Sequence, residues 1–231
     1  MKLSLAAFAL FIICNSLVDA ADEVTIHLDA SEVPEQQVWA EEGQRILAAW
    51  HPRIVNLLSS GDFTAPTTLS LELKRSEKGI AASSGTKIVV FSNWIEKRPE
   101  DFGLLVHELV HVIQRYPRKE PEWVTEGIAD YIRWAIYEGM GQTGFHVPQA
   151  PDGYKEGYQA AAGFLLWLET HDAPGIVRRL NTAMRSSSYT DAVFADMTGR
   201  DLGTLWTEYV KSRRKVGGDE QATWIGSGLA D

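Results

Sequence analysis

The stretch Leu104–Gln114 reads LLVHELVHVIQ and places His107 and His111 four residues apart, with Glu108 directly after the first histidine. Most of its other residues are apolar, so an α-helix over this stretch has no wide polar face and is expected to be buried on most sides. Two imidazoles and a carboxylate are costly to bury unless something pairs with them. A divalent metal ion would do so, and the H-E-x-x-H spacing is typical of zinc sites.

A catalytic zinc site needs a third protein ligand and an open position for water. The best candidate is Glu126, in the segment WVTEGIAD on the next predicted helix, where Gly127 beside it allows two backbones to approach closely. Asp130 lies one turn further along the same face and can accept the free N–H of a ligand histidine. Two alternatives remain: Glu126 and Asp130 belong to a solvated charged stripe, or Glu122 is the third ligand.

The composition predicts a soluble globular protein with a single core. The chain has 231 residues, 45% hydrophobic and 23% charged, which is ordinary for one such domain. Its formal net charge of -9 argues against nucleic acid or an anionic membrane as partner. We expect a monomer that acts on a peptide or protein substrate.

The first twenty residues have the pattern of a secretory signal peptide. Lys2 is followed by a nearly continuous apolar run, Leu3 to Cys14, and small residues precede the expected cleavage after Ala20. Cleavage would remove Cys14, the only cysteine, so the mature protein has no thiol for catalysis or metal binding. We expect a secreted or periplasmic protein with one domain over residues 21–216 and a loose tail over 217–231.

The hydrophobic pattern predicts an α+β fold in which a small N-terminal sheet with helices precedes a mainly helical half that carries the HExxH helix. Alternating apolar and polar residues, or runs of β-branched residues, predict strands. Apolar residues with a 3.6-residue period, in segments that begin or end near proline or glycine, predict helices. The strands are expected at 23–29, 68–74 and 87–91. The helices are expected at 34–61, with a restart or a kink at Pro52, and at 99–115, 121–137, 158–169, 174–185 and 201–215.

Four segments together resemble the basic secretory protein family, a group assigned as zinc metallopeptidases of plants and bacteria. They read HELVHVIQ, WVTEGIADYIRW, GYQAAAGFLLWLE and, after TGR, LWTEY, and the likeness spans residues 23–215. This resemblance implies a zincin-like fold with His107, His111 and Glu126 as zinc ligands and Glu108 as the catalytic carboxylate. The chain departs from the family in being acidic and in lacking cysteines after residue 14.

These expectations combine into zinc-dependent hydrolysis of peptide bonds. Glu108 would act as general base on a metal-activated water. Tyr158, Tyr154 and His146 lie in or beside the long loop 139–157 and could donate to the oxyanion. Tyr158 is preferred because it matches the tyrosine of the family's Gly-Tyr segment, although it could equally pack its ring against a helix. The alternatives are a secreted binding or defence protein with a structural or vestigial zinc site, and a zinc amidase acting on cell-wall links.

Overall fold

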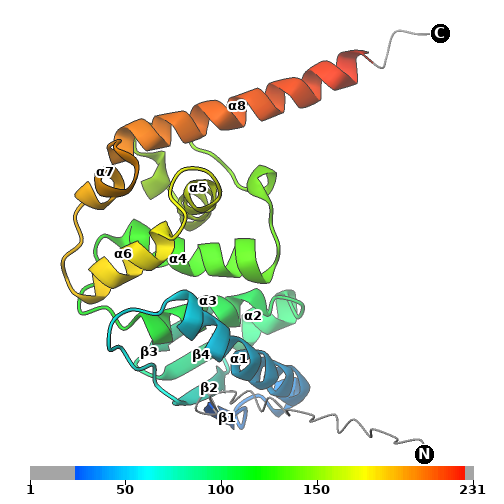
Figure 1. Cartoon of the computed structure of the whole chain (residues 1–231). Coiled ribbons are helices and arrows are strands. Elements are labelled where there is room, and N and C mark those ends of the chain that lie inside the picture. The colour runs from blue at the N-terminus through cyan, green and yellow to red at the C-terminus, as the bar shows by residue number, and fades with distance from the viewer. Residues whose placement is uncertain (1–23, 227–231) are drawn as a thin grey trace, which may run out of the picture.

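The computed structural model describes the backbone of residues 24–226 and the side chains of residues 24–214. The predicted signal segment 1–20 lies outside the described residues. The fold is α+β, with a sheet and two long helices in the N-terminal half and a stack of helices in the second half (Figure 1).

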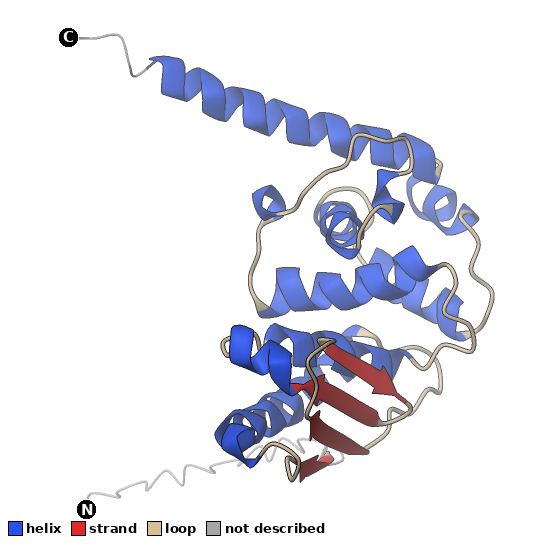
Figure 2. Cartoon of the chain, turned by 180° about the vertical axis from the view of Figure 1, so that it is seen from behind, coloured by secondary structure: helices blue, strands red, loops and turns tan. Residues whose placement is uncertain are grey.

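The sheet has four strands in the order β1-β2-β4-β3, and the first three of these are mutually parallel. The predicted strands are confirmed, since β1, β2 and β4 span Thr25–Asp29, Thr68–Lys74 and Lys87–Phe91. Alternate residues of the central strands point to the core: Leu69, Leu71, Leu73, Ile88 and Val90 are almost fully buried. Both long helices of this half pack on the sheet (Figure 2).

Strand β3 is the feature of the sheet that the sequence analysis missed. It spans Ala81–Ser84 and pairs antiparallel with β4, and no strand within residues 24–226 pairs with its other side. Gly85, with φ +62°, makes the tight turn into β4, and this left-handed conformation favours glycine. Strand β3 is therefore a sheet edge with free backbone groups.

Helix α1, Gln37–Leu57, follows a 3-10 turn at Pro34–Gln36 and continues through Pro52, so the helix does not restart there. A short helix α2, Ser92–Lys97, was not predicted. Helix α3, Gly103–Gln114, carries the HExxH motif and lies beside both α1 and β3. It starts later than the predicted residue 99.

The second half is mainly helical, as predicted, and its helices stack above α3 in Figure 1. The predicted helix 121–137 is present, but its last seven residues form a π-helix. The final helix continues to residue 226 and so includes much of the segment expected as a tail. The elements are α4 (Glu122–Asp130), the π-helix η2 (Tyr131–Tyr137), 3-10 turns at Gln142–Gly144 and Gly153–Lys155, α5 (Tyr158–Thr170), α6 (Ile176–Arg185), α7 (Ala192–Thr198) and α8 (Leu202–Gly226).

Close packing of α4 against α5 fixes the helix that carries Glu126. A Cβ atom on Gly127 would lie only 2.7 Å from the Cβ of Ala161, so the glycine permits the close approach predicted for it.

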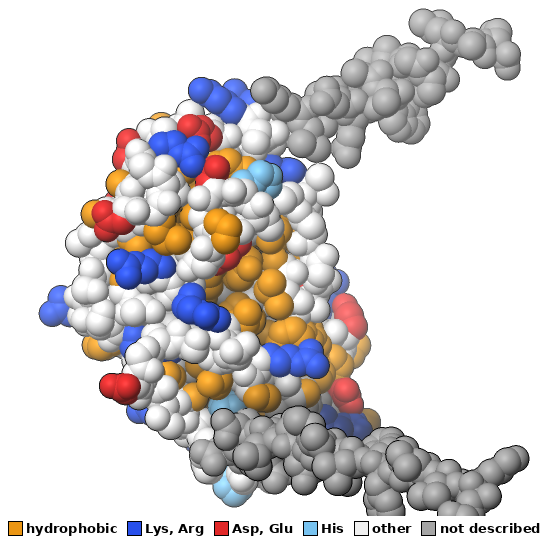
Figure 3. Space-filling view, in the orientation of Figure 1, with side chains coloured by type: hydrophobic (Ala, Val, Ile, Leu, Met, Phe, Trp, Pro, Cys, Tyr) orange, Lys and Arg blue, Asp and Glu red, His pale blue; other side chains and the backbone are white. Residues whose placement is uncertain are grey.

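Hydrophobic side chains also gather in the hollow on the face shown in Figure 3. Among the described residues, no helix combines the length and apolar character needed to cross a bilayer.

Candidate metal and active site

Helices α3 and α4 bring three predicted ligand residues together. The Nε2 atoms of His107 and His111 are 3.1 Å apart, and the Oε2 atom of Glu126 lies 3.3 Å and 3.2 Å from them. The two histidines share a face of α3 because residues four apart stack on a helix. All three side chains are about 85% buried. The arrangement could hold a metal ion.

Asp130 sets the orientation of the His107 ring. Its Oδ1 atom lies 2.7 Å from His107 Nδ1, as expected for the residue one turn after Glu126. Because a carboxylate only accepts, Nδ1 carries the proton in this bond. The Nε2 atom of the neutral imidazole then presents its lone pair to the centre of the cluster.

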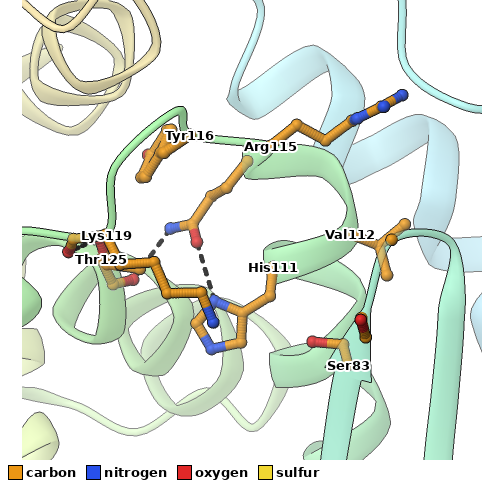
Figure 4. Close-up of a pocket in the computed structure, with 10 residues that line it drawn as sticks. Ser83, His111, Val112, Arg115, Tyr116, Lys119 and Thr125 are labelled. Atoms are coloured by element: carbon orange, nitrogen blue, oxygen red, sulfur yellow. Dashed lines mark hydrogen bonds between the residues drawn. The ribbon is translucent and has the colours of Figure 1, made fainter.

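Gln114 sets the orientation of the His111 ring, and the sequence analysis did not predict this role. The Gln114 Oε1 atom accepts from His111 Nδ1 at 2.9 Å, while Gln114 Nε2 donates to the Thr125 backbone oxygen at 2.9 Å (dashed lines in Figure 4). The second bond fixes which end of the amide faces the histidine. The signal was present in the sequence, since Gln114 follows His111 by three residues and so lies on the same helix face.

The geometry of these three atoms fits a tetrahedral metal ion. Metal–ligand bonds of about 2.0–2.1 Å place neighbouring tetrahedral ligands about 3.3–3.4 Å apart. The separations in the cluster, 3.1–3.3 Å, are close to this. With both Nδ1 protons directed outward and His107 neutral, two lone pairs and a carboxylate oxygen face each other, and such a group favours a cation between its members.

The pKa shifts of His107 and Glu126 also indicate that the cluster favours a positive charge. Burial disfavours the imidazolium form of His107, but its bonds with Asp130 and Glu126 outweigh burial and raise its pKa to about 9. Burial likewise disfavours the charged Glu126, yet the two histidines hold the pKa of this carboxyl well below its usual range.

Glu108 lies next to the cluster without belonging to it. The residue is 9% exposed, and its carboxylate has no hydrogen-bond partner among the residues that the structure describes. One position along an α-helix turns the side chain by about 100° from His107. Glu108 is thus free to hydrogen-bond a water molecule beside the ligands.

The three predicted oxyanion donors lie outside the cluster. Tyr158 is 47% exposed, and its hydroxyl donates to Glu122 at 3.2 Å. Burial and the nearby carboxylates of Glu126 and Glu122 raise the pKa of Tyr158, so its hydroxyl stays protonated. Tyr154 is buried among aromatic rings, and His146 is exposed on the loop.

Strand β3 and helix α3 run side by side in the same direction, with a cavity at each end. One cavity, of about 400 Å³, lies between Ser83–Gly85 and the C-terminal end of α3, including His111. The other, of about 740 Å³, lies between Ile80 and Gly103 at the opposite ends of these elements. His111 therefore lines a cavity whose opposite wall is the C-terminal end of the edge strand β3.

Comparison with known proteins agrees with this site. A search of curated proteins and a search of solved structures returned no match. The sequence profile of a family described as "Peptidase of plants and bacteria" matches residues 15–209, a span that contains both helices of the cluster. The chain therefore belongs to this family of plant and bacterial peptidases, the one that the sequence resembles.

Proposed function

We propose that the protein is a zinc-dependent peptidase. The observation that carries the proposal is the triangle of His107 Nε2, His111 Nε2 and Glu126 Oε2, with both imidazole Nδ1 protons directed away from it. Two imidazoles and one carboxylate are a ligand set of catalytic zinc sites and leave a position for water. The family description supports a peptide substrate.

Each residue of the site has a chemical task in this proposal. Zinc bound there would lower the pKa of a water molecule and polarise the scissile carbonyl. The Glu108 carboxylate accepts the proton of the water and returns it to the leaving amine. Asp130 and Gln114 keep the histidine rings in the tautomer that leaves Nε2 free.

The position of strand β3 beside α3 supports a peptide substrate in extended form. The free edge of β3 presents backbone N–H and C=O groups along α3, and an extended chain can pair with such an edge. Main-chain pairing depends little on side chains, so it holds peptides of many sequences beside the ligands. We propose Tyr158 as a donor to the developing oxyanion, which requires its hydroxyl to leave Glu122.

We also propose that the protein is secreted or periplasmic. Support for this comes from the sequence of the signal segment, with Lys2, the apolar run Leu3 to Cys14, and Ala20 at the expected cleavage point.

The test measures metal content and turnover on the same preparation. Purified protein should contain about one zinc per chain and cleave an unfolded protein, and a chelator should abolish cleavage. Glu108→Gln should retain the zinc and lose about a hundredfold or more in kcat/KM. Glu77→Gln, on an exposed loop, is the matched control and should behave as wild type.

Two outcomes would overturn the proposal. Normal turnover by Glu108→Gln would remove the assigned base. Bound zinc without turnover on any peptide would favour a structural site, and cleavage of peptidoglycan fragments alone would favour an amidase of cell-wall links.

A further inference from the structure

The cavity beside His111 has an unusual charge for this protein. The chain carries a net charge of -9, yet the residues that line this cavity include two cations and no carboxylate. The lining is Ser83, Ser84, Gly85, His111, Val112, Gln114, Arg115, Tyr116, Lys119 and Thr125. The space therefore suits an anionic group, close to the proposed metal.

Lys119 and Arg115 are the two cations that line this cavity. Figure 4 shows the side chain of Lys119 reaching toward the His111 ring, whereas the side chain of Arg115 extends away from it. Within the described part of the chain neither cation forms an ion pair, so the Lys119 ammonium has no carboxylate partner of its own. An ammonium group has three donors to offer a ligand.

The backbone of Lys119 is tied to the site. Its carbonyl oxygen accepts from Thr125 Oγ1 at 2.8 Å, and the carbonyl oxygen of Thr125 accepts from Gln114, which holds His111. Thr125 is 2% exposed. This chain of bonds fixes the starting point of the lysine side chain relative to the ligand histidine.

The opposite wall of the cavity comes from the free sheet edge. Figure 4 shows the Ser83 hydroxyl on the side of the cavity that faces His111. A peptide extended along β3 would pass this wall, and since side chains of an extended chain alternate, one of them or the chain end would enter the cavity. Lys119 and the serine hydroxyl would then be its donors.

We propose that Lys119 binds a carboxylate of the substrate in this cavity, so that the enzyme selects peptides with an acidic group next to the scissile bond. The inference rests on the proposed peptidase function. The carboxylate belongs either to an Asp or Glu side chain or to the free C-terminus of the peptide. The first gives cleavage within acidic segments, and the second gives removal of C-terminal residues.

The experiment compares matched peptides for binding and for cleavage. One set places Glu or Gln at each position flanking the scissile bond, and a second set has a free or amidated C-terminus. Affinities are measured by fluorescence anisotropy with zinc-loaded Glu108→Gln, which retains bound peptide. We expect the carboxylate-bearing member of one set to bind about tenfold more tightly, as for a partly exposed charge-assisted hydrogen bond.

Variants of the loop assign the effect to Lys119. Lys119→Gln should abolish the difference within the pair, and Lys119→Glu should invert it. Arg118→Glu makes the same charge change one residue away, outside the cavity lining, and should leave the preference intact. Circular dichroism and zinc content confirm that each variant is folded and loaded.

The outcomes separate the two proposals. Equal affinity within every matched pair would overturn the carboxylate site even if all peptides are cut. A clear preference in binding without any turnover would support the site and overturn the peptidase function. A uniform loss of kcat in Lys119→Gln, with no change in selectivity, would make the lysine a catalytic group and overturn its proposed role in selection.

Discussion

Removal of metal should make the stability of this protein depend on pH through His107. Its pKa is about 9 in the folded, metal-free chain and about 6.5 in an unfolded chain. The raised pKa means that the folded state binds the extra proton between these values. The stabilisation is complete below pH 6.5 and is lost as the pH rises through 9.

The size of the effect follows from the shift. A difference of about 2.5 pKa units corresponds to about 3 kcal/mol of unfolding free energy, of which about 2 kcal/mol is lost between pH 7.5 and pH 9.5. Two kinds of side chain with a shifted pKa titrate outside this window. Burial lowers the pKa of His51 and outweighs its hydrogen bond with the Pro66 carbonyl, so His51 titrates below this window. Burial raises the pKa of Tyr131 and Tyr209 to about 12, which is above it.

Urea denaturation in the presence of a chelator measures this loss directly, provided that the transition is two-state at each pH. Asp130→Asn keeps an oxygen for His107 Nδ1–H but removes the charge, so the fall between pH 7.5 and 9.5 should shrink. His107→Gln should abolish it. A wild-type protein with constant stability across this window would refute the reasoning, because no buried proton would then be bound at the cluster.

Zinc-loaded protein should show the opposite slope. Protons compete with the metal for both imidazoles, so stability should rise with pH up to neutrality. Comparing the pH dependence of the unfolding free energy with and without zinc therefore separates the contribution of the site from that of the remaining residues.

Three further changes test the surroundings of the site. Gln114→Leu removes the acceptor for His111 Nδ1–H and should weaken zinc binding about tenfold or more, as measured by chelator competition. Gly127→Val forces a side chain against Ala161 and should lower the unfolding free energy by about 1–3 kcal/mol in urea denaturation, and Ala161→Gly should relieve part of this loss. Tyr158→Phe should lower kcat about a hundredfold with little change in KM, and an unchanged kcat would exclude the hydroxyl as oxyanion donor.

The cluster was predictable because its members obey helical spacing. His107 and His111 lie four residues apart on a strongly apolar helix, and Glu126 lies on the next helix beside a glycine that permits close packing. The same spacing rule would have found Gln114. The position of Lys119 was not predictable, because it depends on the path of the loop between α3 and α4.

Strands β1, β2 and β4 were predictable, and the short edge strand β3 was not. Strands β2 and β4 alternate buried and partly exposed residues, the pattern of a sheet with one covered face. Strand β3 reads AASS, its residues are half-buried or exposed, and it forms an edge of the sheet in the described part of the chain. Its sequence therefore has no alternating hydrophobic pattern. Helix α2 was missed because it is too short to show helical periodicity.

For the proposed peptidase activity, the shortness of β3 restricts which substrates can be cut. Four residues of strand offer about 13 Å of free backbone, so only a stretch that can be drawn straight over this distance reaches the histidines. A loop of a natively folded protein has to unravel locally first. For such substrates the rate of cleavage would depend on how often the substrate unfolds locally. Heating that destabilises the substrate would then increase this rate more than a higher catalytic rate of the peptidase.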